Sequence, residues 1–137
     1  LERFRRWVRA QGGDPRVADE PSLLPAAPVV RAVEAPRDER TRSVRYVAGI
    51  DAEEVGAVSV ALGAGRQRKG DPIDPSVGVV LGPKVGAPVE VGERLFTVHA
   101  RNEGDAEEAA QRLLAAYTWA YEPVPAPPLV YDVIRGE

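Results

Sequence analysis

The sequence contains no cysteine and no methionine, and it has a single histidine, His99. The lack of cysteine excludes disulfide bonds, thiolate nucleophiles and zinc–thiolate sites together. One histidine cannot form a histidine-rich metal site. No apolar run approaches the roughly 18 residues that a membrane-spanning helix needs, and no signal-peptide pattern is present. We therefore expect a cytoplasmic protein with no metal site, no bound cofactor and no membrane partner.

Aromatic residues are also scarce, at 6% of the chain, so a core has to be built mostly from valine, leucine, isoleucine and alanine. The formal net charge is −3 and the pI is about 5.3. Nucleic-acid binding requires a concentrated basic surface, so this charge argues against nucleic acid as a partner. Lysine is rare as well: Lys69 and Lys84 are the two in the chain.

The chain has 137 residues, which suits one domain or one domain with an appendage. It has no methionine even at position 1, and it opens directly in a helical pattern, LERFRRWVRA. Initiator methionine is removed mainly before small residues, and Leu1 is not small. We therefore expect this chain to be the C-terminal portion of a longer protein.

Residues 1–11 predict a helix, with Leu1, Phe4 and Val8 on one face and Gly12-Gly13 as its stop. A connector rich in proline and acidic residues follows. We expect a boundary here, with a helix and connector over residues 1–27 and an α+β domain over residues 28–137.

Within that domain, segments rich in β-branched residues predict strands, and apolar periodicity predicts helices. The predicted strands are 29–35, 44–50, 77–81, 94–100 and 129–134, and the predicted helices are 51–62 and 105–121. Asp51 with Glu54, and Asp105 with Glu108, have the spacing of helix caps. In the second helix, Leu113, Ala116, Tyr117 and Ala120 form an apolar stripe.

Several segments are candidates for chemistry, and each also has a structural interpretation. The loop GAGRQRKGDP (63–72) imitates a phosphate loop, but its glycines follow a helix and precede a strand, which is the wrong order. The arginines of 36–45 alternate with acidic residues, which favours a solvated hairpin tip over a phosphate site. Asp51, Glu53 and Glu54 are better explained by helix capping than by acid–base catalysis. His99 is a potential general acid or base, yet a structural or surface role is favoured because no carboxylate partner can be inferred.

The stretch VGVVLGPKVGAPVEVGERLFTVHA (77–100) places glycines at turns that separate short extended segments. Gly86 and Gly92 are predicted to adopt positive φ. The pattern V-G-x-x-V-x-x-G-x-x-L resembles the half-motif of biotinyl and lipoyl carrier domains, which implies a barrel-sandwich-hybrid-like sheet. The region in which those domains carry the modified lysine reads VHARNEGD here and contains no lysine. The resemblance therefore implies the fold without the carrier function.

A longer set of motifs resembles the C-terminal domain of the pyrimidine nucleoside phosphorylases, over about residues 28–137. Five blocks occur in the family's order: YVAGIDAEEVG, LGAGR, DPIDPSVGVVL, KVGAPVEVGERLFTVHA and PPLVYDVI. In the family, a short turn follows the first strand, and a glycine stands just before the aromatic residue of the next strand. In this chain the connecting segment is longer, and Arg45 occupies the position of that glycine.

The resemblance implies an enzyme that cleaves pyrimidine nucleosides with inorganic phosphate as co-substrate, giving a free base and a pentose 1-phosphate. The family's phosphate-binding and base-binding residues lie upstream, and no stretch of this chain matches them. No catalytic, cofactor-binding or metal-binding residue is therefore assigned. The implied partners are the upstream catalytic domains of a homodimeric enzyme. The alternative is a free-standing binding or structural module on the lipoyl/biotinyl-like fold.

Overall fold

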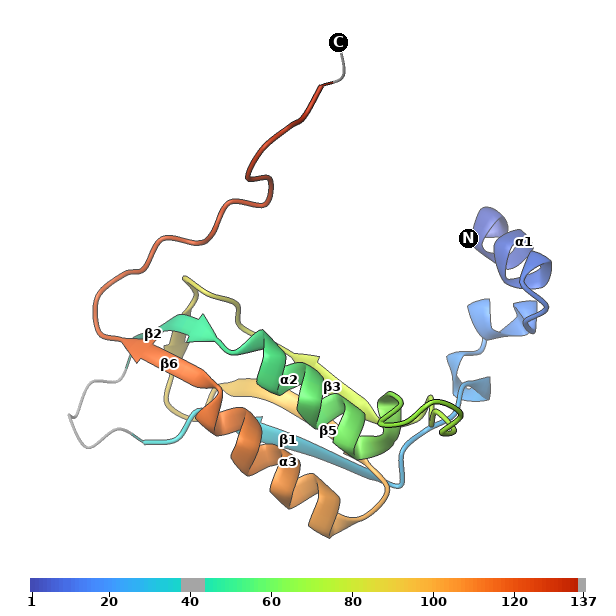
Figure 1. Ribbon diagram of the computed structural model, residues 1–137, viewed down its shortest axis with the longest axis horizontal. Coiled ribbons are helices and arrows are strands. Elements are labelled where there is room, and N and C mark those ends of the chain that lie inside the picture. Colours follow the sequence, from blue (N-terminus) through green and yellow to red (C-terminus); the bar gives the residue numbers. More distant parts are fainter. Residues whose placement is uncertain (38–43, 136–137) are drawn as a thin grey trace.

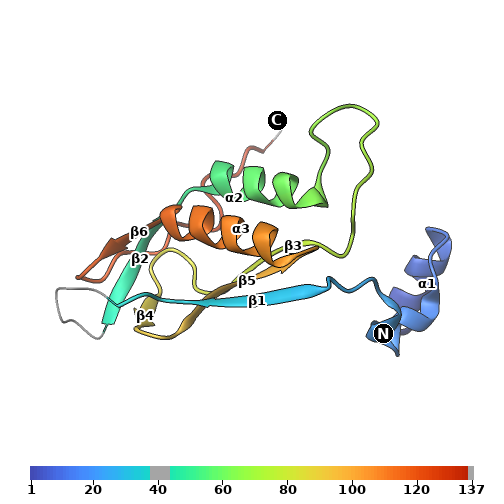
Figure 2. The ribbon, with the colours of Figure 1, turned by 90° about the horizontal axis from the view of Figure 1, so that it is seen from below.

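The computed structural model describes residues 1–37 and 44–135 (Figure 1). Its first part is an N-terminal arm, composed of α1 (Glu2–Ala10), η1 (Pro15–Ala18) and η2 (Pro21–Leu23). The helix predicted over residues 1–11 is confirmed, and Gly12 beyond its end has φ of +79°. The arm lies at one end of the molecule and contains no buried residue (Figures 1 and 2).

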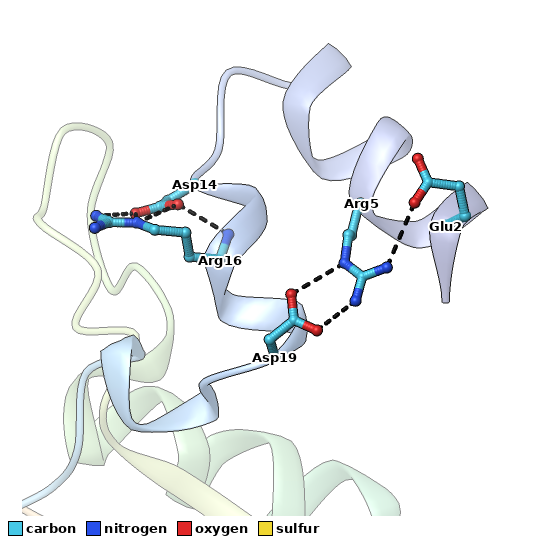
Figure 3. A network of polar contacts seen from close by, with 5 residues as sticks. All are labelled: Glu2, Arg5, Asp14, Arg16 and Asp19. Atoms are coloured by element: carbon cyan, nitrogen blue, oxygen red, sulfur yellow. Dashed lines mark hydrogen bonds and ion pairs between the residues drawn. The ribbon is translucent and has the colours of Figure 1, made fainter.

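Ion pairs hold the arm in its bent shape (Figure 3). The Arg5 guanidinium donates to both carboxylate oxygens of Asp19, with Nε–Oδ2 at 3.0 Å, and also contacts Glu2. Asp14 caps η1 by accepting from the backbone N–H of Arg16 at 2.9 Å, and it also accepts from the Arg16 guanidinium. Hydrogen bonding with Arg5 and Arg16 lowers the pKa of Asp19 and Asp14 respectively.

The strands of the described part form two three-stranded antiparallel sheets, in the orders β1-β5-β3 and β4-β2-β6. Their bounds are β1 (Val29–Glu34), β2 (Val44–Ile50), β3 (Gly78–Leu81), β4 (Pro88–Glu90), β5 (Arg94–Ala100) and β6 (Tyr117–Ala120). The first four predicted strands, over residues 29–35, 44–50, 77–81 and 94–100, are thereby confirmed.

The predicted hairpin between β1 and β2 is wrong, because the two strands belong to different sheets. β1 pairs with β5 over the whole length of β1, from Val29 opposite Ala100 to Glu34 opposite Arg94. The segment that joins β1 to β2 is longer than the two to five residues of a tight hairpin loop, so it does not impose their pairing. The predicted tip includes residues 38–43, which lie outside the described residues.

α2 (Ala52–Ser59) and the π-helical turn η3 (Val60–Ala64) confirm the helix predicted over residues 51–62. The Asp51 carboxylate accepts from the backbone N–H of Glu54 at 3.1 Å, as the cap spacing predicts. Gly63, with φ of +108°, then turns the chain out of the helix. Glycine adopts this conformation at little cost, which explains why the helix ends here.

α3 (Glu103–Ala115) begins two residues before the predicted start. Its cap is Asn102, not Asp105, because the Asn102 side chain accepts from the backbone N–H of Asp105 at 2.9 Å. The Asp105 carboxylate instead accepts from the Asn102 amide at 3.0 Å. Asn102 has extended backbone angles, φ −151° and ψ 169°, which are typical of an N-cap residue.

The same helix ends earlier than predicted, at Ala115, and Tyr117–Ala120 form β6 instead of a last helical turn. Tyr117 pairs with Ile50 of β2, and Trp119 pairs with Val47. Aromatic and β-branched residues favour strands, and β2 provides an edge with which this segment can pair. Pairing with a distant strand therefore overrides the helical periodicity of the local sequence.

The predicted strand over residues 129–134 is also wrong, because this segment pairs with no strand of the described part. These residues follow a proline-rich segment and project away from the sheets as an unpaired chain with bends at Leu129 and Tyr131 (Figure 1). Leu129 and Ile134 are almost fully exposed. A strand requires a hydrogen-bonding partner, and neither described sheet supplies one to this segment.

The core lies between the helices and the sheets, which makes the domain α+β, as predicted. α2 and α3 cover one face of the sheet β1-β5-β3 (Figure 2). The largest fully buried side chains are Phe96, Leu95, Leu113, Val47, Val58, Val89 and Val98. Leu113 of the predicted apolar stripe packs in this cluster, whereas Ala120 of that stripe lies in β6 and not in the helix. No helix among the described residues is long and apolar enough to cross a membrane.

Candidate functional site

The loop 63–72, the strongest imitation of a phosphate loop in the sequence, is a turn organised by its own aspartate. The Asp71 carboxylate accepts from the backbone N–H of Arg68 at 2.7 Å, and the Asp71 carbonyl accepts from Arg66 Nε at 3.2 Å. A phosphate loop presents free backbone N–H groups to its anion. Here a carboxylate occupies such an N–H, and its negative charge would repel a bound phosphate.

Asp74, which follows this loop, connects it to Arg101 in the turn between β5 and α3. Its carboxylate accepts from the Ser76 hydroxyl at 2.6 Å, from the Ser76 N–H at 3.0 Å and from Arg101 Nε at 3.0 Å. These hydrogen bonds, those of Ser76 above all, lower the pKa of Asp74 to about 2. A Cβ atom at Gly63 would overlap the Arg101 guanidinium, so a larger residue at this position would displace the Arg101 side chain. Sequence analysis did not identify this cluster.

His99 lies on the face of the sheet β1-β5-β3 that the helices leave uncovered. It pairs with Val30 of β1 and Gly78 of β3, and its side chain is half-buried. It borders a shallow hollow together with Val30, Val80, Thr97 and Arg94. Among the described residues no carboxylate lines this hollow, so none is placed there to orient the imidazole for acid–base catalysis.

Two of the three candidate acid–base carboxylates, Asp51 and Glu54, make structural contacts. Asp51 caps α2, and Glu54 accepts from Arg112 Nε of α3 at 2.7 Å, which ties the two helices together. Glu53 is exposed. Within residues 1–37 and 44–135, no three histidine or acidic side chains lie close enough to hold a metal ion.

Arg45 is buried, which corrects its prediction as part of a solvated tip. Only 8% of this residue is exposed; its guanidinium lies 3.7 Å from the centre of the Trp119 ring and donates to the Pro36 carbonyl at 3.0 Å. A cation over an aromatic face is stabilised by the ring quadrupole. Arg37 is exposed, and Arg40 and Arg42 lie outside the described residues.

The ring of Trp119 continues into a stack that joins the two sheets. Tyr117 lies 5.7 Å from Trp119 and 6.0 Å from Phe96 of β5, measured between ring centroids. Burial raises the pKa of Tyr117, and its hydroxyl has no hydrogen-bond partner in the described part of the chain. The arginine that replaces the expected glycine thus completes a structural stack and does not form an anion site.

The described residues form an α+β domain whose polar clusters cap helices, fasten loops and tie elements together. Comparison with known proteins identifies its family. Residues 46–120 match the family model described as pyrimidine nucleoside phosphorylase C-terminal domain, which is more than half of the chain. The chain therefore belongs to this family of C-terminal domains.

Two bacterial relatives extend the match over nearly the whole chain. The pyrimidine-nucleoside phosphorylase of Geobacillus stearothermophilus is 40% identical over 134 residues, and that of Staphylococcus aureus strain USA300 is 36% identical over the same length. Each alignment covers 98% of this chain but 29% of the relative. The chain thus spans less than a third of the length of these curated relatives.

Proposed function

We propose that this chain is the C-terminal structural domain of a pyrimidine nucleoside phosphorylase. Such an enzyme transfers the pentose of a pyrimidine nucleoside to inorganic phosphate and releases the free base. The observation that carries the proposal is the identity of 36–40% over 98% of the chain to two proteins of that name. The family match over residues 46–120 supports it independently.

The catalytic residues are proposed to lie in the part of the enzyme that this chain does not include. In phosphorolysis a phosphate oxygen attacks the anomeric carbon while the bond from that carbon to the base nitrogen breaks. This step needs a phosphate cradle and donors that stabilise the negative charge on the departing base. The loop 63–72 bonds to its own aspartate, whose negative charge opposes a bound phosphate, so it does not provide this cradle.

The finer assignments follow from the same proposal. We assign residues 1–27 to the helix and connector of the preceding domain, because the arm lies apart from the sheets (Figure 1). The glycine turns and the two three-stranded sheets support a barrel-sandwich-hybrid-like fold. We further propose a homodimeric cytoplasmic enzyme that binds neither nucleic acid nor a membrane, in keeping with its net charge of −3.

The test compares the isolated chain with the full-length polypeptide that contains it. Each is incubated with thymidine or uridine and phosphate, and released base is measured. We expect release by the full-length polypeptide and none by the isolated chain, which should also not bind phosphate at millimolar concentration in calorimetry. Base release by the chain alone, or phosphate binding abolished by Arg66→Ala or Lys69→Ala, would contradict the proposal that the catalytic residues lie outside this chain. An inactive full-length polypeptide would favour the alternative of a binding or structural module.

A further inference from the structure

The uncovered face of the sheet β1-β5-β3 carries two large apolar residues that the domain leaves exposed. Val30 of β1 is 59% exposed, and Val80 of β3 is 61% exposed. Among the described residues of β1–β6, α2 and α3, no other large apolar residue is exposed. The two valines flank β5, with Val30 opposite His99 and Val80 opposite Thr97. They therefore belong to one surface, on the side of the sheet away from the helices (Figure 2).

The free face of an antiparallel sheet is usually polar, but the centre of this surface has no acidic residue, lysine or arginine in the described strands. Beside the two valines lie Ala32, Thr97 and His99. The charged residues Glu34 and Arg94 lie opposite each other at one end. An apolar centre with polar residues at its rim is typical of a surface that contacts another part of a protein.

The same surface is hollowed, and its one charged lining residue is a cation. Val30, Val80 and Arg94 are among the residues that line the hollow. Arg94 forms no ion pair with a described residue, and no carboxylate in the described part of the chain lines the hollow. Complementary charges set which surfaces fit together. The hollow therefore fits a partner that presents an apolar side chain with a carboxylate next to it.

The polypeptide enters the domain beside this surface. Residues 24–28 join the N-terminal arm to Val29, which directly precedes Val30 (Figure 2). Five residues span at most about 18 Å, so the arm stays near this end of the sheet. The chain matches 29% of the two relatives as a C-terminal domain, so most of such an enzyme precedes the arm. The arm and connector are themselves rich in exposed large apolar residues, namely Leu1, Phe4, Trp7, Leu23 and Leu24.

We propose that the preceding part of the phosphorylase polypeptide packs on the uncovered face of the sheet β1-β5-β3, around Val30 and Val80. The inference rests on the proposed function, because it takes the covering part from the larger enzyme. That part places an apolar side chain in the hollow and a carboxylate beside Arg94. The connector holds the two parts at a high effective concentration, so a small apolar contact is sufficient to keep them together.

The first test measures how fast diethyl pyrocarbonate modifies His99 in the isolated chain and in the full-length polypeptide. Mass spectrometry of the peptide that contains His99 gives both rates. We expect modification to be at least about 10-fold slower in the full-length polypeptide, since a covered group reacts only when its cover opens. As a control, the two proteins should react at the same rate when both are unfolded in urea. Equal rates in the folded proteins would overturn the proposal.

The second test combines Val30→Thr with Val80→Thr, which keeps the β-branched shape and adds two hydroxyl groups. The double variant should lower the thermal midpoint of the full-length polypeptide by at least about 2 °C, where the hydroxyls are covered, and leave that of the isolated chain unchanged. Val91→Thr is the matched control, because Val91 is exposed but lies beyond β4, outside this surface. No shift in the full-length polypeptide, or the same shift in both proteins, would overturn the proposal.

The same measurements separate this inference from the proposed function. Phosphorolysis by a full-length polypeptide in which His99 reacts as fast as in the isolated chain would leave the function standing and reject the interface. Slow modification without activity on any pyrimidine nucleoside would do the reverse. If His99 also reacts slowly in the isolated chain, and faster when that chain is diluted, the cover is a second copy, and the proposal is wrong.

Discussion

At the scale of single residues, the Asp74 carboxylate accepts three hydrogen bonds, although sequence analysis did not single it out. It connects the loop after η3 to Ser76 and to Arg101 beyond β5. These interactions favour the charged carboxylate and lower its pKa from 3.8 to about 2. A group whose pKa is lower in the folded state stabilises that state above its unfolded pKa and loses the effect as pH falls through the folded value.

We therefore predict that Asp74→Asn lowers the thermal midpoint at pH 7, and that the difference from the wild type shrinks between about pH 4 and about pH 2. Thermal unfolding followed by circular dichroism at several pH values checks this. Asp132→Asn, in the exposed C-terminal segment, is the control and should follow the wild-type pH dependence. A difference for Asp74→Asn that stays constant from pH 7 to pH 2 would contradict the role given to the charge.

Gly86 combines two requirements, a positive φ of +91° and close contact with the backbone at Val124 and Ala126. We predict that Gly86→Val destabilises more than Gly92→Val, because Gly92 has φ of +82° but an added Cβ there would lie 4.0 Å from its nearest neighbour, the Glu34 carboxylate. Conformational strain alone costs about 1–3 kcal/mol, and the clash at Gly86 adds to it. Ala87→Val is the control, with a small effect expected in chemical denaturation. Equal losses at all three positions would show that neither strain nor contact matters here.

At the scale of elements, Leu113 is the largest of the buried side chains with which α3 packs on the domain. Leu113 is fully buried, whereas its neighbour Leu114 is only partly buried. Removing a buried leucine side chain costs about 2–5 kcal/mol, because it loses transfer free energy and leaves a cavity. We predict a loss in this range for Leu113→Ala and a clearly smaller one for Leu114→Ala, both measured by urea unfolding. Similar losses would mean that the helix is rotated relative to the described packing.

At the scale of the whole molecule, exposed apolar residues gather outside the core at both ends of the chain. In α1, Leu1 and Trp7 are 71% and 62% exposed, and residues 129–134 are exposed at the other end. The central part, in contrast, has its helices tied to each other and to the sheets by buried side chains and ion pairs. This distribution fits a structural domain that is joined to the rest of a larger enzyme, as proposed above.

The features that sequence analysis predicted correctly are local ones. Asp51 caps α2 because a short carboxylate reaches the N–H three residues on, whatever lies elsewhere in the chain. Gly86 and Gly92 have positive φ because glycine alone lacks the Cβ that opposes it. Strands β1, β2, β3 and β5 follow from runs of β-branched residues.

The features that sequence analysis missed depend on partners far away in the chain. Whether Tyr117–Ala120 continue a helix or form a strand is decided by β2, which lies about 70 residues earlier and offers a pairing edge. Burial of Arg45 depends on the ring of Trp119, and the pairing of β1 with β5 depends on which strand reaches its edge. Local patterns set the conformation that each segment prefers, but hydrogen-bond partners and buried contacts are supplied by the assembled fold. Residues 129–134 keep the preference for a strand and lack a partner for the same reason.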